Sequence, residues 1–345
     1  MTTQPVRVQV RGPRALAAIV PHLLGFHPDH SLVIVAVSGP HGRVHSAFRF
    51  DLPDPPDPSE AAAIAGHTIA VLRGQRLTTA VALGYGPGTQ VTPVADILRV
   101  VLPEAGIQLR DILRVHESRC WSYLCPDPTC CPPDGIPVGI GDHPAATALA
   151  MAGLPAAASR AVLASTIAPL RGPDAYAMRE ATVCAERAAA ERLASHGQDA
   201  LDDWHLTAVK AAIACYRTGE GDADPDELAI LSVGLTSLRV RDDAWARMDP
   251  SFQEAHVRLW TDLTRRAQPG YVAAPASLLA FTAWQGGEGA LANLALDRAL
   301  ADDPGYSMAH LLRDALAAAL PPSAARLPMT PEEVAASYEA LRRDR

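Results

Sequence analysis

The side chains best able to do chemistry lie close together in the chain. Four of the six cysteines fall on one short stretch, at Cys120, Cys125, Cys130 and Cys131. Cysteine thiolates bind zinc, and structural zinc sites commonly space paired cysteines by two to four residues. Here each gap holds four residues and no second such pair follows, so His116 or His143 would have to complete four ligands. We predict no metal here and keep a zinc site as an alternative.

The stretch is also stiff, because residues 121–135 hold four prolines, which fix φ and remove backbone donors. It predicts a rigid loop, neither helix nor central strand. Aromatic side chains offer large areas to bury, so we expect Trp121 and Tyr123 to be substantially buried and the cysteines to act mainly through packing.

Two further interpretations of the cysteines remain open. A disulfide from Cys125 to Cys130 or Cys131 would lock the loop, although disulfides are rare in the cytosol. A catalytic thiol would need a base and a lowered pKa, and His116 and Arg119 are near in sequence. The sequence around these cysteines contains no recognisable nucleophile motif.

A glycine-rich turn at residues 84–88 separates a predicted strand from a predicted helix. Such a turn can place backbone amides and a helix N-terminus around an anion, although it matches neither a dinucleotide fingerprint nor a Walker loop. Ligands of open α/β sheets bind beyond the carboxyl ends of the strands. The end of the predicted strand 107–115, with Arg114, would lie at the same edge as the glycine-rich turn. The candidate ligand-binding residues are therefore Arg49, Gly84, Gly86, Gly88, Arg114, Trp121 and Tyr123.

Two other polar groups have simpler interpretations. Arg49 and Asp51 share one face of a predicted strand, so a structural ion pair is favoured over anion binding. Three histidines, His22, His27 and His30, surround a Gly-Phe pair, and we interpret them as solvated loop residues rather than metal ligands.

Hydrophobic patterning supplies the elements that position these residues. Alternation or continuous apolar runs predict strands at residues 6–10, 31–37, 44–50, 77–85 and 107–115. Helices are predicted at 13–24, interrupted near Pro21, and at 60–74 and 92–102. The alternation of strand and helix predicts an α/β domain over residues 1–141, with a mostly parallel sheet and one hairpin. We place the cysteine-rich loop 116–136 at the domain junction.

After residue 144 alanine and leucine recur at helical spacing, which predicts an all-α domain over residues 144–345. Within it, residues 278–312 have a helix-turn-helix pattern resembling a tetratricopeptide (TPR) unit. Gly286-Gly287 separate the two helices, and Ala292 and Ala299 should be buried where the helices pack closely.

Composition narrows the class of protein. The chain of 345 residues is 48% hydrophobic and 20% charged, with net charge −8, which argues against a protein whose whole surface binds nucleic acid and leaves a local basic patch open. No signal peptide opens it and no apolar run is long enough to span a bilayer. We expect a soluble cytoplasmic protein without a membrane association or cofactor.

Three segments resemble one family, the actinobacterial DUF4192 family. They are residues 21–33 (PHLLGFHPDHSLV), residues 121–135 (WSYLCPDPTCCPPDG) and a third made of 280–295, 299–300 and 303–309. The family is a domain of unknown function, so the resemblance implies an actinobacterial cytoplasmic protein but no activity, cofactor or catalytic residue.

These features favour a non-catalytic binding or scaffold protein. The α/β domain would hold a small anionic ligand or a peptide, and the helical domain would contact a protein partner. The alternative is an enzyme of unrecognised type, with its site between the carboxyl ends of the strands and the loop 121–135.

Overall fold

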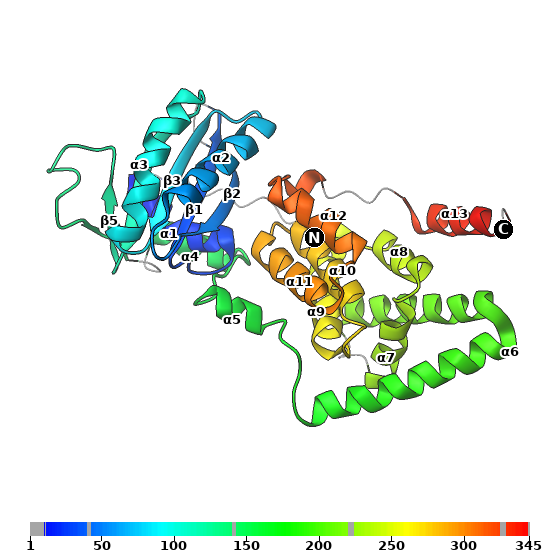
Figure 1. The fold of residues 1–345 in the computed structure, drawn as a ribbon. Helices are drawn as coiled ribbons and strands as arrows, with labels where there is room; N and C mark the ends of the chain where they lie inside the picture. The colour runs from blue at the N-terminus through cyan, green and yellow to red at the C-terminus, as the bar shows by residue number, and fades with distance from the viewer. Residues whose placement is uncertain are drawn as a thin grey trace. The chain divides into compact units, whose positions relative to one another are not determined.

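The structure is a computed structural model that describes residue 10 and residues 12–39, 43–139, 143–219, 224–324 and 329–343. The described residues divide into two compact units (Figure 1). The first belongs to Met1–Leu163 with Ala318–Pro321, and the second to Ala164–Ala317 with Pro322–Arg345. As predicted, the strands lie in the N-terminal region and the C-terminal part is mostly helical.

A six-stranded sheet forms the centre of the first unit, in the order β2-β1-β3-β4-β5-β6. Its strands are β1 (Ser31–Ser38), β2 (Arg43–Asp51), β3 (Thr79–Tyr85), β4 (Gln108–His116), β5 (Arg119–Ser122) and β6 (Ile136–Pro137). The pair β3–β4 is parallel, and the other four neighbouring pairs are antiparallel. The sheet is therefore mixed, and the predicted mostly parallel sheet is wrong.

The hairpin explains the difference. Because β2 returns antiparallel to β1, the helix that follows it delivers β3 in the direction of β2, and β1 then lies between these two strands. Only the next crossover, from β3 through a helix to β4, joins neighbouring strands in parallel. The predicted strand over residues 6–10 lies outside the described residues except for Val10, which is in no strand.

Helices cover both faces of the sheet. The helices that precede the second unit or lead into it are α1 (Gly12–Leu24), α2 (Pro58–Gly74), α3 (Gly88–Glu104), α4 (Pro144–Met151) and α5 (Arg160–Ser165). Apolar side chains of α2 and α3 pack against Leu32, Ile34 and Ile112 on one face. The buried side of α1 lies on the other face, where the Tyr85 hydroxyl donates to the carbonyl of Ala17. Helix α1 continues through Pro21, so the predicted interruption is wrong.

Part of the predicted cysteine loop is a strand. After β4 the chain reverses at Glu117 and Ser118, both with positive φ, and returns as β5, in which Trp121 pairs with Arg114. A two-residue turn with two positive φ values matches the twist of a hairpin. The loop prediction is wrong for Arg119–Ser122 and correct for the proline-rich segment that follows.

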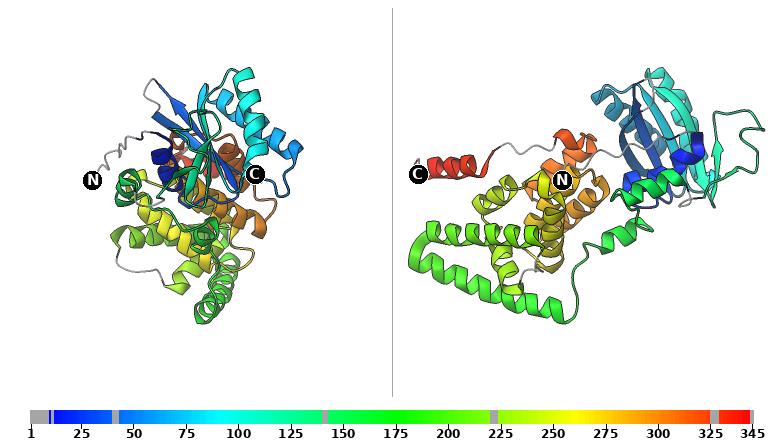
Figure 2. Two further views of the ribbon diagram at one scale, coloured as in Figure 1. Left: turned by 90° about the vertical axis from the view of Figure 1, so that its left-hand side faces the viewer. Right: turned by 180° about the vertical axis from the view of Figure 1, so that it is seen from behind.

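The second unit is built from helices. They are α6 (Pro173–Thr218), α7 (Pro225–Gly234), α8 (Leu238–Ala246), α9 (Gln253–Arg266), α10 (Ala273–Gln285), α11 (Gly289–Asp302), α12 (Ser307–Ala317) and α13 (Pro331–Arg343). Figure 2 shows α6 as two arms, and Gly197 has a positive φ at the bend between them. Among the described residues, no helix combines the length and apolar character needed to cross a membrane.

Helices α10 and α11 pack against each other on either side of a turn at Gly286 and Gly287. Ala292 and Ala299 are both fully buried, which confirms that prediction. Their small side chains let α11 approach its neighbours closely. Trp260 of α9 and Phe281 of α10 are the largest fully buried side chains among the described residues.

Candidate functional site

The candidate site lies where β3 and β4 end and α3 begins. Parallel strands bring their carboxyl ends to one edge, and here Gly84 pairs with Arg114 and Tyr85 with Val115. The turn at Gly86 then leads into α3, whose first residue is Gly88. The start of β1 reaches the same edge, because Ser31 pairs with Tyr85 in the antiparallel ladder.

The three predicted glycines each permit a close approach. A Cβ on Gly84 would lie 2.3 Å from Cγ1 of Val91, so glycine lets α3 pack directly on β3. Gly86 has φ +144°, and its N–H donates to the carbonyl of Val115. A Cβ on Gly88 would lie 2.7 Å from Nη1 of Arg114, so the guanidinium lies against the N-terminus of α3.

Arg114 is half-buried and is held by stacking. Its guanidinium carbon lies 3.8 Å from the centroid of the Trp121 ring, its cross-strand partner on β5. Among the described residues it makes no ion pair and no hydrogen bond. A half-buried cation without a counter-ion is costly, so this guanidinium is available to an anion.

The N-terminus of α3 adds to the positive potential. Its first turn has no acidic residue and its N-cap, Pro87, offers no side-chain acceptor. In the part of the chain that the structure describes, the N–H groups of Gly88 and Thr89 donate to no protein acceptor. Free amides and the helix dipole both favour an anion at this position.

The two predicted aromatic residues are each half-buried, less than expected, and each has a defined polar contact. Trp121 Nε1 donates to the carbonyl of Pro133, 2.9 Å away, and its ring leaves no space for a Cβ on Gly135. The Tyr123 hydroxyl lies 2.8 Å from the Thr92 hydroxyl of α3. Trp121 thus positions Arg114, while Tyr123 ties the strand end to α3.

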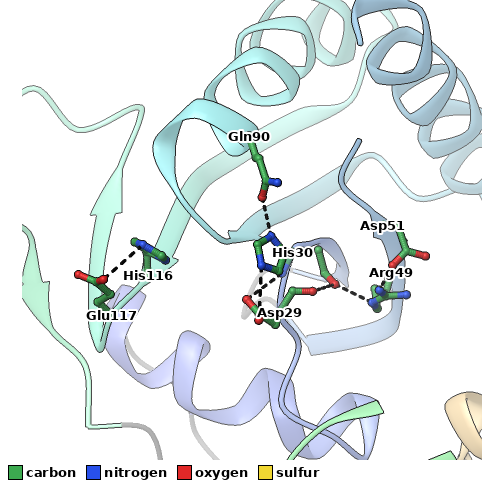
Figure 3. A network of polar contacts seen from close by, with 8 residues as sticks. Asp29, His30, Arg49, Asp51, Gln90, His116 and Glu117 are labelled. Atoms are coloured by element: carbon green, nitrogen blue, oxygen red, sulfur yellow. Dashed lines mark hydrogen bonds and ion pairs between the residues drawn. The ribbon is translucent and has the colours of Figure 1, made fainter. Parts of the chain in front are cut away.

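A second polar group at this edge was not recognised from the sequence as a site. His30 Nδ1 lies 2.7 Å from Oε1 of Gln90, a buried residue in the first turn of α3, and its Nε2 is 3.7 Å from Asp29 (Figure 3). The sequence predicts a solvated histidine here, and the ring of His30 is exposed. The signal that would have found it is the antiparallel direction of β1, which brings its start to this edge.

The structure separates Arg49 from the other candidates. Phe48 and Phe50 of β2 face the core under α2 and α3, so Arg49 points to the opposite face of the sheet. Its guanidinium pairs with Asp51 and donates to the Ser31 hydroxyl (Figure 3). Arg49 therefore has its partners within the protein, as the structural interpretation expected.

The predicted ligand set of four cysteines is divided. Cys125, Cys130 and Cys131 lie together, with all three sulfur atoms within 4.8 Å of one another. Cys120 is fully buried on β5 and lies outside this group. Its burial, and to a smaller extent the negative charge of Asp111, raise the pKa of its thiol to about 11. His116 lies beside Glu117, and His143 caps α4.

Two of these thiols, Cys120 and Cys131, have the opposite character to a nucleophile. Partial desolvation and hydrogen bonds with Cys125 and Cys130 raise the pKa of Cys131 to about 12. A reactive cysteine needs the opposite shift. The raised pKa of Cys120 is of the same kind, so a nucleophilic role is disfavoured for these two thiols.

The helical unit has an arginine-lined pocket of its own. A cavity of about 360 Å³ beside α6 and α9 is lined by Tyr216, Gly219, Arg258, Thr261, Asp262, Arg265 and Arg266. Asp262 accepts from Tyr216 and Arg266, and Arg258 donates to a backbone carbonyl. Since two of its arginines already have protein partners, this pocket is a weaker anion site than the sheet edge.

Comparison with known proteins identifies a family of unknown function. Residues 13–323 match the family model described as Domain of unknown function (DUF4192). Neither curated proteins nor solved structures gave a match. Because the match spans most of the 345 residues, the chain belongs to the DUF4192 family.

Proposed function

We propose that this protein is a non-catalytic binding protein whose α/β unit holds a small anionic ligand at the edge formed by β3, β4 and α3. One observation carries the proposal. The Arg114 guanidinium, without an acidic partner among the described residues, lies against Gly88 at a helix N-terminus that also lacks an acidic residue.

The electrostatics favour a bound anion. A cation at a helix N-terminus is unfavourable, because the helix dipole places partial positive charge there. An anion between Arg114 and the amides of Gly88 and Thr89 would neutralise both. The planar guanidinium forms paired hydrogen bonds with carboxylate or phosphate oxygens, and stacking on Trp121 already restricts its rotamers.

Binding fits this edge better than catalysis does. An enzyme would need a nucleophile or general base beside the bound anion, and the Cys120 thiol lies on the opposite face of the sheet from Arg114, because Cys120 pairs with Val115 while Trp121 pairs with Arg114. The described contacts of His30 are with Gln90 and Asp29.

Replacing Arg114 with methionine should weaken the binding of inorganic pyrophosphate by about tenfold or more, since a hydrogen bond to a charged group contributes about 1.5–3 kcal/mol. Isothermal titration calorimetry measures the affinity. Arg110→Met is the matched control, because Arg110 is exposed near the other end of β4. Equal affinities of the wild type and Arg114→Met, or no binding to the wild type, would refute the proposal.

A protein partner on the helical unit is a second proposal. Tyr176, Val183 and Leu193 of α6 are 64%, 46% and 45% exposed, and their spacing of seven and ten residues places them on one side of the helix. The TPR-like interpretation of α10 and α11 belongs to the same proposal. A photo-crosslinker at Val183 should capture a defined partner in the native host, whereas one at exposed Lys210, on α6 beyond the bend at Gly197, should capture less; equal capture would contradict the proposal.

We also propose a cytoplasmic location and an actinobacterial source. The resemblance of three segments to that family supports the source, and free cysteines are typical of a reducing compartment. Fractionation of the native host should place the chain in the cytoplasm; recovery from the membrane or culture medium would exclude it.

A further inference from the structure

Three cysteine side chains converge within the loop that follows β5. The sulfur atoms of Cys125, Cys130 and Cys131 lie within 4.8 Å of one another, and all three are free thiols. Cys125 and Cys131 are half-buried and Cys130 is exposed. The cluster thus combines two sheltered thiols with one that solvent can reach.

The loop is fixed to the sheet at its start. The Ser122 hydroxyl accepts from the N–H groups of Leu124 and Cys125 and donates to Asp111 of β4, 2.6 Å away. These contacts hold Cys125 against the end of β5. Its position is therefore determined by the sheet rather than by the loop alone.

The other two cysteines are fixed by a turn and by contacts to β5. The N–H of Cys131 donates to the carbonyl of Asp127, 2.7 Å away, which closes the turn that carries Cys130. Beyond it, Arg119 donates to the carbonyls of Asp134 and Gly135. The backbone thus presents three sulfur atoms to one point without the help of a ligand.

We propose that Cys125, Cys130 and Cys131 bind one thiophilic metal ion, zinc or copper(I), through three thiolates. Thiolates select these ions over hard cations. A Zn–S distance of about 2.3 Å places the sulfur atoms of a tetrahedral site roughly 3.8 Å apart. The observed spacing of up to 4.8 Å closes to that value by small side-chain rotations.

The ligand number sets the character of the site. Cys120, His116 and His143 have other surroundings, so the cluster of described ligands stops at three. A zinc ion would keep its fourth position for water or an outside ligand, whereas copper(I) is satisfied by three sulfurs. A disulfide would use two thiols and leave the third over, which gives no reason for the convergence of all three.

The test is the metal content of the full-length protein, purified in a reducing buffer without chelators after growth with added zinc or copper. Elemental mass spectrometry should find about one ion per chain, as three ligands around one centre require. Each of Cys125→Ser, Cys130→Ser and Cys131→Ser should reduce the content to near zero. Cys184→Ser, at an exposed cysteine of α6, should retain the ion.

A second measurement needs no variant and is independent of folding defects. Iodoacetamide labelling followed by peptide mass spectrometry should show Cys125, Cys130 and Cys131 protected until a chelator is added, while Cys184 reacts throughout. Cobalt(II) exchange, with thiolate charge-transfer absorption, distinguishes a zinc site from a copper(I) site. The proposal fails if the wild type retains neither metal, if all three variants retain it, or if two of the three thiols form a disulfide in the freshly purified reduced protein.

Discussion

Replacing Gly84 with alanine should lower the free energy of unfolding of the α/β unit by about 1–3 kcal/mol, the usual effect of overpacking a core. The new Cβ would lie 2.3 Å from Cγ1 of Val91, which is fully buried, so α3 must move away from β3. Because α3 carries Gly88, the same change should weaken anion binding. Urea denaturation and calorimetry measure the two effects.

Gly66→Ala is the control for this substitution. Gly66 is exposed inside α2 and has open space around its Cα, so alanine there should raise stability by about 0.5–1 kcal/mol through helix propensity. Adding Val91→Ala to Gly84→Ala should restore part of the lost stability. A Gly84→Ala protein as stable as the wild type would show that α3 does not pack on the strand at this point.

Acidification should destabilise the helical unit by up to about 3 kcal/mol through one buried histidine. His256 of α9 is 2% exposed, and burial, followed by the charge of Arg217, lowers its pKa to about 4 while Asp249 opposes the shift. In the unfolded chain the pKa is near 6.5. The unfolded state therefore takes up a proton first, so this contribution to stability is complete above pH 6.5 and is lost as the pH falls toward 4.

Chemical denaturation followed by tryptophan fluorescence between pH 7 and 4 would measure this loss. The carboxylates titrate in the same range, so the informative quantity is the difference between the wild type and His256→Gln, which should have a shallower pH dependence. His196→Gln changes an exposed histidine of α6 and should match the wild type. Identical pH profiles for all three proteins would contradict the assignment.

Local patterning was sufficient for most of the secondary structure. The sequence predicted β1 from its continuous apolar run and β2 from the turn and alternation that follow it. Helices α2 and α3 follow from their own apolar spacing and N-terminal residues. The direction of a strand relative to its neighbours does not follow from local residues, because it depends on which strands lie side by side in the sheet. The mostly parallel prediction rests on each crossover helix joining two neighbouring parallel strands, whereas β3 lies beside β1, antiparallel, and not beside β2.

For the candidate site, the sequence predicted several of the residues but not the contacts between them. Strand-helix turn chemistry identified Gly84, Gly86 and Gly88, and the strand end identified Arg114. The stacking of Arg114 on Trp121 depends on the register of the β4–β5 hairpin. The prolines after Trp121 predict a loop there, so the sequence does not indicate this hairpin. Likewise the contact of His30 with Gln90 joins residues sixty positions apart, and no local pattern predicts such a pairing.

The most direct test of the anion site is a nuclear magnetic resonance titration of isotopically labelled protein with inorganic pyrophosphate. The account predicts saturable shifts centred on the backbone amides of Gly88 and Thr89 and on Nε of Arg114, and their loss in Arg114→Met. Unchanged resonances at these groups, or saturable shifts confined to the arginine-lined pocket at Arg258 and Arg265, would contradict it.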